Sequence, residues 1–522
     1  MYRYETHCHT APVSHCASAS AEDTVRFYKR LGYDGIFLTN HFFDGNINPL
    51  ARKLPFQEMI DFYFRDYEDA AMIGARVGLK VFPGVELSYQ GTDFLIYGLD
   101  KDWYKTHAGI LKMKKTEELP LLMEAGALVI QAHPYREADY IDHIRLYPRC
   151  VHGVEVFNSG QPEEANALAD GYAEHYGLLK TWGSDNHWGS NAFDRLRGKG
   201  YRPELAGVET ERPIDSVRDF IDMAKNGRLR PFYLREDGCV RTEYPLERSG
   251  IALHLDCVRA EGSRAGRNIL LVHGVTYSSR EFDIDCEDYS LVRRLARAGW
   301  AVWRLDIAGF GRSGEVPDGF LPDSDYAAED IRAAVERIVR ETGQHAIDVL
   351  GWSWGTVTVS RFAAAHPEHV RRLVLYAPIL SGLGEQAVNE PFHQNSLEHA
   401  AEDFQRGADG GFDPAITDPA LVERWCASCM AYDGAHSPNG GRRDLCVSRS
   451  VSLIDPARLS VPTLVICGDR DPYLDRARLR SVLDLLPPGS ALEIIAGGGH
   501  AVFVEKPFHR DFQERLLRFL SA

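Results

Sequence analysis

The sequence predicts an α/β protein with two structural units. Apolar runs of strand length alternate with segments of helical period, which is the pattern of a parallel sheet covered by helices. At roughly 150 residues per domain, 522 residues give three or four domains, although barrels and large α/β units often run to about 200–250 residues each. The pattern also changes near Glu247, because many earlier runs end in His, Asp or Glu and later ones lead into Gly-rich turns. We therefore expect two domains, 1–235 and 248–522.

The composition is that of an ordinary globular protein, with 44% hydrophobic and 26% charged residues. The apolar runs are well short of the ~20 residues of a membrane helix, and the first residues contain no signal-peptide core. Ten scattered cysteines are typical of reduced cytoplasmic thiols. A net charge of −16 without a basic stripe argues against nucleic acid. We expect a cytoplasmic protein without membrane or nucleic-acid partners, and its oligomeric state stays open.

The first 235 residues contain seven short apolar runs that we predict as strands. Segments between several of them, such as 22–31 and 61–77, have helical period, which favours a parallel sheet or barrel. In a β/α barrel the carboxyl ends of the strands gather at one mouth, so residues far apart in sequence converge there. Glu155 and Asn158 of the sixth run are expected to support the core or that mouth. The predicted strands span 4–10, 35–41, 80–88, 92–99, 127–133, 153–158 and 179–185.

Histidines and carboxylates follow these strands at spacings typical of a metal site. His7 and His9 flank one residue of the first strand, so both side chains point to the same face. Imidazole together with carboxylate favours Zn, Fe or Mn over Ca. A single histidine is more often a satisfied loop or core residue, but eight ligand-type side chains at strand ends predict a metal centre. They are His7, His9, His15, His41, Glu86, His133, Asp185 and His187.

Five motifs carry these side chains in order: His7-Cys8-His9-Thr10, Thr39-Asn40-His41, Gly84-Val85-Glu86, Ala132-His133-Pro134 and Gly183-Ser184-Asp185-Asn186-His187. The set resembles the PHP family (polymerase and histidinol phosphatase) over about residues 1–230. The resemblance implies a distorted seven-stranded β/α barrel with two or three divalent metal ions. His15 stands where many trinuclear members carry a third N-terminal histidine. Where many members have histidine on the fourth strand, this chain has Asp93, which is expected either to coordinate or to support a ligand.

The charge balance of the predicted metal site suggests its substrate. Three divalent ions would carry more charge than Glu86, Asp93 and Asp185 neutralise, so the mouth would attract a phosphate dianion. Such ions also activate water as a nucleophile, and phosphomonoester hydrolysis follows more naturally than hydrolysis of a neutral ester. Arg136, which closely follows His133, is either a clamp for that phosphate or a plain surface arginine.

The second half contains further apolar runs that we predict as strands, with a helix at 325–341. Residues 379–455 interrupt this rhythm and are rich in Gly, Asn, His and Asp. We interpret them as an inserted cap at about 380–455. The linker between the two halves is predicted around 234–248, where Gly and charged residues replace the pattern. The predicted strands span 269–272, 301–305, 346–350, 373–376, 462–467 and 491–495.

The stretch Gly351-Trp352-Ser353-Trp354-Gly355 fits the G-x-S-x-G pattern of a nucleophile elbow, with a strand before it and a helix after it. Asp471 and His500 follow downstream, in the Ser, Asp, His order of this kind of site. We assign Ser353 as nucleophile, His500 as general base and Asp471 as its partner, with Asp469 as the competing acid. The N–H groups of Val275 and Trp354 are predicted to form an oxyanion hole, worth ~3–4 kcal/mol per donor.

The motifs that accompany this elbow are His273-Gly274, the run from Asp306 to Ser313, and Gly498-Gly499-His500. Together they resemble the α/β-hydrolase fold superfamily over about residues 248–522. The resemblance implies a serine nucleophile that needs no cofactor. It leaves the substrate open among the esters, thioesters, lipids and peptides that such enzymes cleave. A serine nucleophile argues against the haloalkane and epoxide chemistry of the aspartate members.

We interpret the chain as a bifunctional hydrolase. The N-terminal domain is expected to hydrolyse phosphomonoesters with metal ions, and the C-terminal domain to hydrolyse esters or thioesters with a Ser-His-Asp triad. In one alternative only one domain is catalytic and the other binds or positions substrate. In another the barrel is a nuclease, against which the acidic charge balance counts. Fusion of two hydrolases suggests a small-molecule partner that carries a phosphate, an acyl-type bond, or both.

Overall fold

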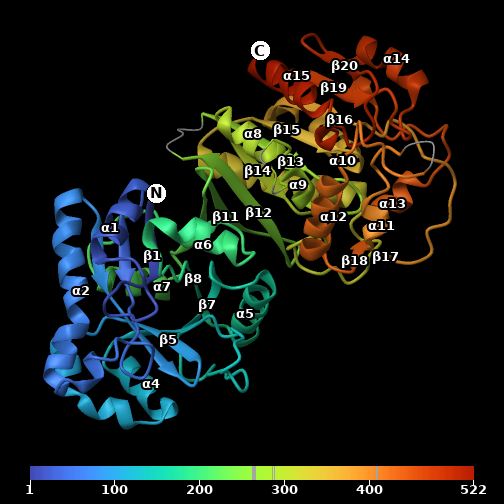
Figure 1. The fold of residues 1–522 in the computed structure, drawn as a ribbon. Coiled ribbons are helices and arrows are strands. Elements are labelled where there is room, and N and C mark those ends of the chain that lie inside the picture. Colours follow the sequence, from blue (N-terminus) through green and yellow to red (C-terminus); the bar gives the residue numbers. More distant parts are fainter. Residues whose placement is uncertain (262–265, 285, 287, 407–409) are drawn as a thin grey trace. The chain divides into compact units, whose positions relative to one another are not determined.

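The computed structural model describes residues 1–261, 266–284, 286, 288–406 and 410–522. It divides into two compact units, residues 1–242 and residues 243–522 (Figure 1). The boundary falls within strand β11 (Cys239–Arg248). The segment predicted as an irregular linker is therefore largely a strand, in which Val240 pairs with Leu234 of the preceding strand.

The strands of the N-terminal unit lie in two sheets, with the orders β10-β9-β1-β2-β3 and β4-β5-β6-β7-β8. Its long helix α2 packs against α1 and β3, and α5 packs against β7 (Figure 1). The strands are β1 (Tyr2–Cys8), β2 (Gly35–Leu38), β3 (Lys80–Pro83), β4 (Val85–Tyr89), β5 (Thr92–Tyr97), β6 (Leu128–Ala132), β7 (Gly153–Asn158), β8 (Leu179–Gly183), β9 (Glu204–Thr210) and β10 (Arg230–Arg235). The α-helices are α1 (Ala21–Arg30), α2 (Phe56–Val77), α3 (Lys101–Thr106), α4 (Lys115–Glu124), α5 (Glu163–Tyr176), α6 (Ala192–Gly198) and α7 (Val217–Lys225).

The predicted distorted seven-stranded barrel is not shown, because the strands of residues 1–242 form two ladders and no closed barrel is found among them. The pairing is also not all parallel, since β5 runs antiparallel to both β4 and β6, and β9 runs antiparallel to β1. The predicted strand 80–88 is two strands that belong to different sheets. Gly84 separates them at a crowded point, where a Cβ would lie 2.7 Å from Thr39 Cγ2. A run of apolar residues predicts burial, but not the direction or the partner of a strand.

Two isolated bridges join the two sheets of this unit at the strand ends. Cys8 bridges to Asn186, and His41 bridges to Glu86. Both bridges are parallel: one joins the end of β1 to the residues after β8, and the other joins the residues after β2 to β4. The expectation that strand ends converge therefore holds locally, although the sheet does not close.

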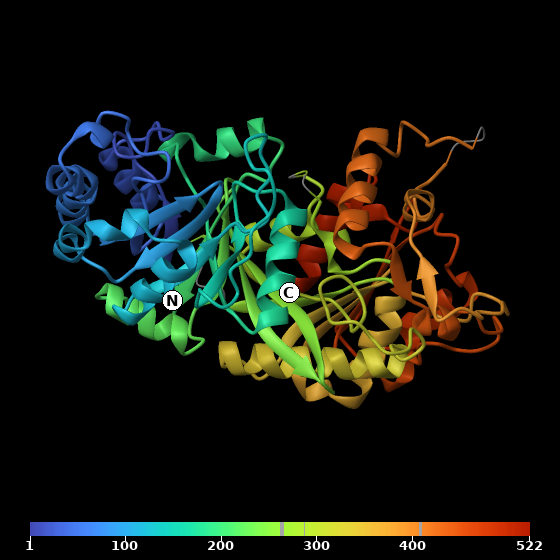
Figure 2. The ribbon, with the colours of Figure 1, turned by 90° about the horizontal axis from the view of Figure 1, so that it is seen from below.

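The C-terminal unit contains a sheet with the strand order β20-β19-β16-β15-β13-β14-β12. In this order, the neighbouring strands β20, β19, β16, β15, β13 and β14 are all parallel, and β12 runs antiparallel to β14. Helices α9 and α10 pack against each other, as do α8 and α15, and Figure 2 shows the yellow α9 and the red α15 on either side of the sheet. The sheet strands are β12 (Ile251–Ala260), β13 (Arg267–Val272), β14 (Trp300–Leu305), β15 (Ile347–Trp352), β16 (Val370–Tyr376), β19 (Thr463–Gly468) and β20 (Ala491–Ile495). The helices around it are α8 (Leu291–Arg297), α9 (Ser324–Thr342), α10 (Trp354–Ala365), α14 (Arg476–Leu485) and α15 (His509–Ser521).

The segment between β16 and β19 forms the short elements that Figure 1 draws in orange. They are β17 (Phe392–Gln394), α11 (Leu397–Ala400), α12 (Pro419–Asp433), β18 (His436–Pro438) and α13 (Gly440–Leu445). β17 and β18 pair with each other and with no strand of the large sheet among the described residues. None of the helices in the described ranges has both the length and the apolar character needed to cross a membrane.

Candidate functional sites

Imidazole and carboxylate side chains from several strand ends meet in the N-terminal unit. His7 Nε2 lies 3.3 Å from Glu86 Oε1 and 3.3 Å from Asp185 Oδ1. His9 Nε2 lies 3.1 Å from His7 Nε2 and 3.2 Å from the same Asp185 oxygen. His41 Nδ1 lies 2.5 Å from Glu86 Oε2. The carboxylates of Glu86 and Asp185 therefore lie beside His7 and His9 at the end of β1, and Glu86 also contacts His41.

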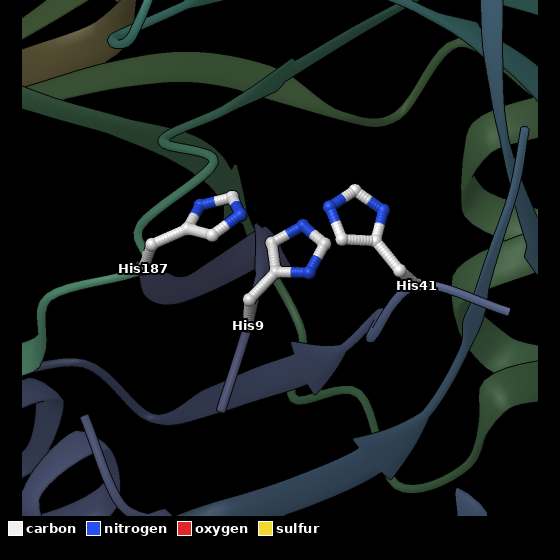
Figure 3. Close-up of side chains that lie close together, drawn as sticks. All are labelled: His9, His41 and His187. Atoms are coloured by element: carbon white, nitrogen blue, oxygen red, sulfur yellow. The ribbon is translucent and has the colours of Figure 1, made fainter. Parts of the chain in front are cut away.

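The ligand-type atoms form three overlapping groups in which all atoms lie within 4.8 Å of one another. Figure 3 shows one group, with the ring of His9 between those of His187 and His41. The His9 ring centroid is 4.1 Å from that of His187 and 4.5 Å from that of His41. The groups are His9, His41 and His187; His7, His9 and Asp185; and His7, Glu86 and His133.

Many polar atoms of this cluster are buried without a hydrogen-bond partner. They include Nδ1 of His41, both oxygens of Glu86, both ring nitrogens of His133 and Oδ1 of Asp185. An unsatisfied buried polar group costs about 1–3 kcal/mol, so several together indicate that a ligand satisfies them. The close N···O approaches around Glu86 do not have hydrogen-bond geometry, as is expected for atoms that coordinate shared ions. Nitrogen and carboxylate oxygen are ligands of Zn, Fe and Mn, so the residues fit a divalent metal centre.

The far sides of the β1 histidines are held by hydrogen bonds. His7 Nδ1 lies 2.9 Å from Glu155 Oε1, and His9 Nδ1 lies 3.0 Å from Ser14 Oγ. Asn158 Nδ2 donates to the other Glu155 oxygen at 2.9 Å. Such outer contacts fix the ring orientation of metal-binding histidines and leave Nε2 to face the ion. Glu155 and Asn158 thus support the cluster, whereas Ser14 gave no signal in the sequence because an isolated serine has no distinctive spacing.

Two of the cluster residues adopt a left-handed backbone. His133 has φ 26° and Asp185 has φ 52°, both of which are rare for residues other than glycine. Backbone strain of this kind costs about 1–3 kcal/mol and concentrates at functional sites. Each of these residues directly follows or closely follows a strand, so the strained turn aims the side chain into the cluster.

His15 is the predicted ligand that the structure does not bring to the cluster. Its side chain is exposed and belongs to none of the three groups. The neighbouring Cys16 instead lines the cavity together with His41 and His187. Burial opposes ionisation of the Cys16 thiol, but hydrogen bonds to the two histidines outweigh it and lower the pKa to about 6. The signal in the sequence that could have indicated Cys16 is its thiol, which directly follows the predicted ligand His15.

Asp93 lies at the edge of the cluster. Its Oδ2 is 3.9 Å from His133 Nε2 and accepts a hydrogen bond from Arg136 Nη1 at 3.1 Å. Burial raises the pKa of the Asp93 carboxyl. Both Asp93 and Arg136 line a cavity of 690 Å³, into which His41, Asp185 and His187 also open. The structure thus joins the two residues whose roles the sequence left open.

Ser353 stands on a sharp turn between β15 and α10 in the C-terminal unit. Its backbone has φ 56° and ψ −121°, a strained conformation for serine. The flanking glycines make the turn possible. A Cβ on Gly351 would lie 2.3 Å from the carbonyl oxygen of Gly355, and a Cβ on Gly355 would lie 2.5 Å from that of Val272. Helix α10 begins directly after Ser353, so its N-terminus favours negative charge at the serine.

The structure pairs His500 with Asp471. His500 Nδ1 lies 2.8 Å from Asp471 Oδ2, and both side chains are almost fully buried. Burial lowers the pKa of His500, but the Asp471 carboxylate outweighs it and holds the pKa above its ordinary value. The competing Asp469 accepts a hydrogen bond from the Gly497 N–H instead, and is exposed. The ring of Trp352, next to Ser353, packs 5.5 Å from the His500 ring.

The backbone N–H groups of Val275 and Trp354 donate to no acceptor in the part of the chain that the structure describes. Val275 and Ser353 both line a cavity of 320 Å³. Gly274 approaches the serine closely, since a Cβ on it would lie 3.6 Å from Ser353 Cβ. Its N–H donates to Glu281 at 2.6 Å, which fixes the loop that carries Val275. Two free donors beside a serine are the arrangement that stabilises a developing oxyanion.

Residues 263–507 match the family model described as serine aminopeptidase, S33. The C-terminal unit is an α/β-hydrolase domain. Its strand order, its nucleophile elbow and this match confirm the predicted fold of that half and its class as a hydrolase. The name of the matched model describes a peptidase, and the fold alone does not choose the bond that is cleaved.

Two curated proteins show the range of relatives. The chain is 30% identical over 310 residues to the polyketide synthase ThaQ of Burkholderia thailandensis, which covers 55% of this chain and 13% of the synthase. It is 23% identical over 251 residues to the pimeloyl-[acyl-carrier protein] methyl ester esterase of Citrobacter koseri, covering 46% of this chain and 89% of the esterase. The chain thus spans about an eighth of the synthase and most of the esterase.

Two solved structures also align with about half of the chain. The bromoperoxidase from Bacillus anthracis is 20% identical, with a TM-score of 0.39, and the alignment covers 54% of this chain and 100% of that chain. The thioesterase domain from the curacin biosynthetic pathway is 16% identical, with a TM-score of 0.38, and the alignment covers 54% and 99%.

Proposed function

We propose that the α/β-hydrolase unit cleaves an ester or thioester through Ser353. The observation that carries the proposal is the strained serine, which shares a cavity with two unpartnered N–H donors in a unit that also holds a buried histidine–carboxylate pair. The esterase relative and the structurally aligned thioesterase domain bear names that agree with this bond type.

The reaction follows from the positions of these groups. Ser353 Oγ attacks the carbonyl carbon of the acyl group while His500 Nε2 takes the serine proton. Asp471 holds Nδ1–H of His500 and stabilises the imidazolium. The N–H groups of Val275 and Trp354 receive the negative oxygen of the tetrahedral intermediate. His500 then protonates the leaving alcohol or thiol, and water, deprotonated by His500, releases the acyl group from Ser353.

A fluorophosphonate probe and a panel of short acyl esters and thioesters test this proposal. The wild-type chain should be labelled once, at Ser353, and should hydrolyse members of the panel. Ser353→Ala should abolish both labelling and turnover. Ser360→Ala, in the second turn of α10, is the matched control that should keep both, since its Oγ donates to the Thr356 carbonyl oxygen within the helix. Labelling that survives Ser353→Ala would show that another residue is the nucleophile.

We also infer that the N-terminal unit is a metal-dependent phosphomonoesterase, which makes the chain bifunctional. The observation that supports it is the group of buried, unpartnered nitrogen and oxygen atoms, of which those of His41 and Asp185 belong to residues that line the 690 Å³ cavity. The motif resemblance to the PHP family points the same way. Two or three divalent ions (Zn, Fe or Mn) would be held by His7, His9, His41, Glu86, His133, Asp185 and His187, with Asp93 at the edge.

Divalent ions bound by this set would polarise a phosphoryl oxygen and activate water. The chain's own residues would position the substrate and the ligands. Arg136 donates to Asp93 through Nη1, which holds its guanidinium at the cavity for a phosphate oxygen. Glu155 and Ser14 fix the rings of His7 and His9. Elemental analysis of protein purified without chelator should find at least two divalent ions per chain, and less than one would contradict the proposal.

Cys16 takes the ligand place that the sequence gave to His15. Both residues are exposed, but Cys16 lines the cavity beside His41 and His187, and His15 does not line it. Cobalt(II) in place of the native ions provides a direct readout, because a thiolate ligand adds a charge-transfer band in the near ultraviolet. The band should be present in the wild type and in His15→Ala, and absent in Cys16→Ser. A wild-type spectrum without it would show that Cys16 is no ligand.

A further inference from the structure

The cavity above Ser353 contains an arginine that the hydrolytic mechanism does not use. Arg442, on α13, lines this cavity together with Ser353 and Val275. Its Nη2 donates to Thr276 Oγ1 at 2.6 Å. Its Nη1 donates more weakly, to the Val275 carbonyl oxygen at 3.4 Å and to Asn439 Oδ1 at 3.3 Å. All of these acceptors are uncharged.

The positive charge of Arg442 has no close anionic partner. Across the described residues, no carboxylate oxygen lies within 4.0 Å of its guanidinium nitrogens. Two acidic side chains, Glu402 and Asp403, share the cavity and act on the guanidinium from beyond this distance. Glu402 is exposed and lies 3.9 Å from His399, and Asp403 hydrogen-bonds to Tyr473. Burial lowers the pKa of Arg442 to about 10, so the guanidinium still carries its charge at neutral pH.

The same packing that forms the active site holds Arg442 in place. The preceding Gly441 packs against the ring of Trp354, and a Cβ there would lie 2.6 Å from Trp354 Cε2. Asn439 N–H donates to the Gly319 carbonyl oxygen at 2.9 Å, which fixes the start of α13. The guanidinium is therefore held beside the loop that carries the oxyanion donor Val275, in the cavity that Ser353 also lines.

A partly buried guanidinium without a counter-ion is costly unless a ligand supplies one. Its planar fork matches the two oxygens of a carboxylate or phosphate, and such charge-assisted hydrogen bonds are about twice as strong as neutral ones. We propose that Arg442 binds an anionic group of the substrate, so the hydrolase unit acts on esters or thioesters that carry a carboxylate or phosphate a few bonds from the scissile carbonyl. This inference rests on the proposed function of Ser353.

Matched substrate pairs on the full-length protein test the proposal. One pair is an aryl monoester of a short dicarboxylic acid and the same ester with its free carboxylate methylated. The other pair is a thioester whose thiol portion carries a phosphate and the same thioester without it. The wild type should prefer the anionic member of at least one pair by roughly 10- to 100-fold in kcat/KM. The pair that shows the preference tells whether the anion lies on the acyl or on the leaving-group side.

The variants separate charge recognition from support of the oxyanion loop. Arg442→Met should remove the preference while lowering turnover of the neutral esters by less than about threefold, and Arg442→Lys should keep part of it. Arg443→Met on the same helix is the matched control, since Arg443 is exposed and contacts the Phe320 carbonyl. It should behave as wild type.

Three other outcomes would each overturn one of these claims. Equal losses on charged and neutral substrates in Arg442→Met would show that Arg442 only supports the loop. A wild type that hydrolyses the charged and neutral members of both pairs equally well would show that Arg442 binds no anionic group of the substrate. A wild type that hydrolyses no ester or thioester at all would instead refute the proposed function itself. Competition by free dicarboxylate and by inorganic phosphate, each absent in Arg442→Met, gives an independent readout of the anion site.

Discussion

The two candidate sites of this chain differ in which of their polar groups have hydrogen-bond partners. In the C-terminal unit the histidine and aspartate satisfy each other, and the groups without partners are the two N–H donors beside Ser353. In the N-terminal unit the unpartnered atoms belong to the candidate ligands themselves, Glu86 and His133 among them. The first pattern agrees with the proposed nucleophilic site, and the second agrees with the proposal that the cluster binds divalent ions. Unsatisfied buried groups thus distinguish a site that is chemically complete from one that needs a further component.

The largest difference between the two sites is expected when Ser353 is replaced. Ser353→Ala should lower kcat/KM for acyl hydrolysis by about 10⁴-fold or more, because the nucleophile of a triad acts as a unit with its base. Metal content and phosphomonoester hydrolysis should not change. Steady-state kinetics on both substrate classes measure the two effects in one preparation. A comparable loss of phosphatase activity would mean that the sites are not independent.

A smaller effect is expected from the outer contacts of the metal cluster. Glu155→Gln should weaken divalent-ion affinity by about 10- to 100-fold, since Glu155 holds the ring of His7. Competition with a chromophoric chelator measures this affinity without relying on catalysis. Glu174→Gln is the control, because the Glu174 side chain is exposed and forms an ion pair with Lys180. Equal affinities for the two variants would show that Glu155 does not orient a ligand.

The elbow should be less tolerant of a methyl group than an ordinary helix. Gly355→Ala places a Cβ 2.5 Å from the Val272 carbonyl oxygen and should cost about 1–3 kcal/mol of the free energy of unfolding, as overpacking does. Gly171→Ala, in the interior of α5 with nothing within 4 Å, should instead stabilise by roughly 0.5–1 kcal/mol. Denaturant titration of both variants gives the contrast. A neutral Gly355→Ala would mean that the turn can relax.

The smallest effect concerns pH. His500 must be neutral to take the serine proton, and Asp471 holds its pKa above the ordinary 6.5. Acyl hydrolysis should therefore fall tenfold per pH unit below that pKa and level off above it. Asp403 also raises this pKa, so Asp403→Asn should move the midpoint slightly to lower pH. A midpoint below 6.5 in the wild type, or a shift to higher pH in the variant, would contradict this electrostatic picture.

The sequence predicted the C-terminal half well because its signals are local. The elbow, the Gly-rich turns and the strands before them lie within a few residues of one another, and local steric rules decide such turns. The choice of Asp471 over Asp469 also agrees with the hydrogen bond to His500. The cap at 380–455 was predicted only as an interruption, since short elements such as β17 and α13 have too few residues for a periodic pattern.

The N-terminal half was predicted less completely because its decisive features are long-range. Apolar runs indicated most strands, but not that β5 runs antiparallel or that Gly84 separates two sheets. Strand-end positions correctly brought His7 and His41 to one cluster. They could not tell His15 from Cys16, because adjacent loop residues differ in direction only through the three-dimensional path of the loop.

The central claim is that this chain carries two chemically independent hydrolytic sites, one dependent on metal and one on Ser353. The most direct measurement assays phosphomonoester and acyl-ester hydrolysis in four samples: wild type and Ser353→Ala, each before and after complete chelation with elemental analysis. We predict that chelation abolishes only the phosphatase activity and that adding metal back restores it. Ser353→Ala should abolish only the esterase activity. Loss of both activities from either treatment, or a phosphatase activity that survives metal removal, would contradict the account.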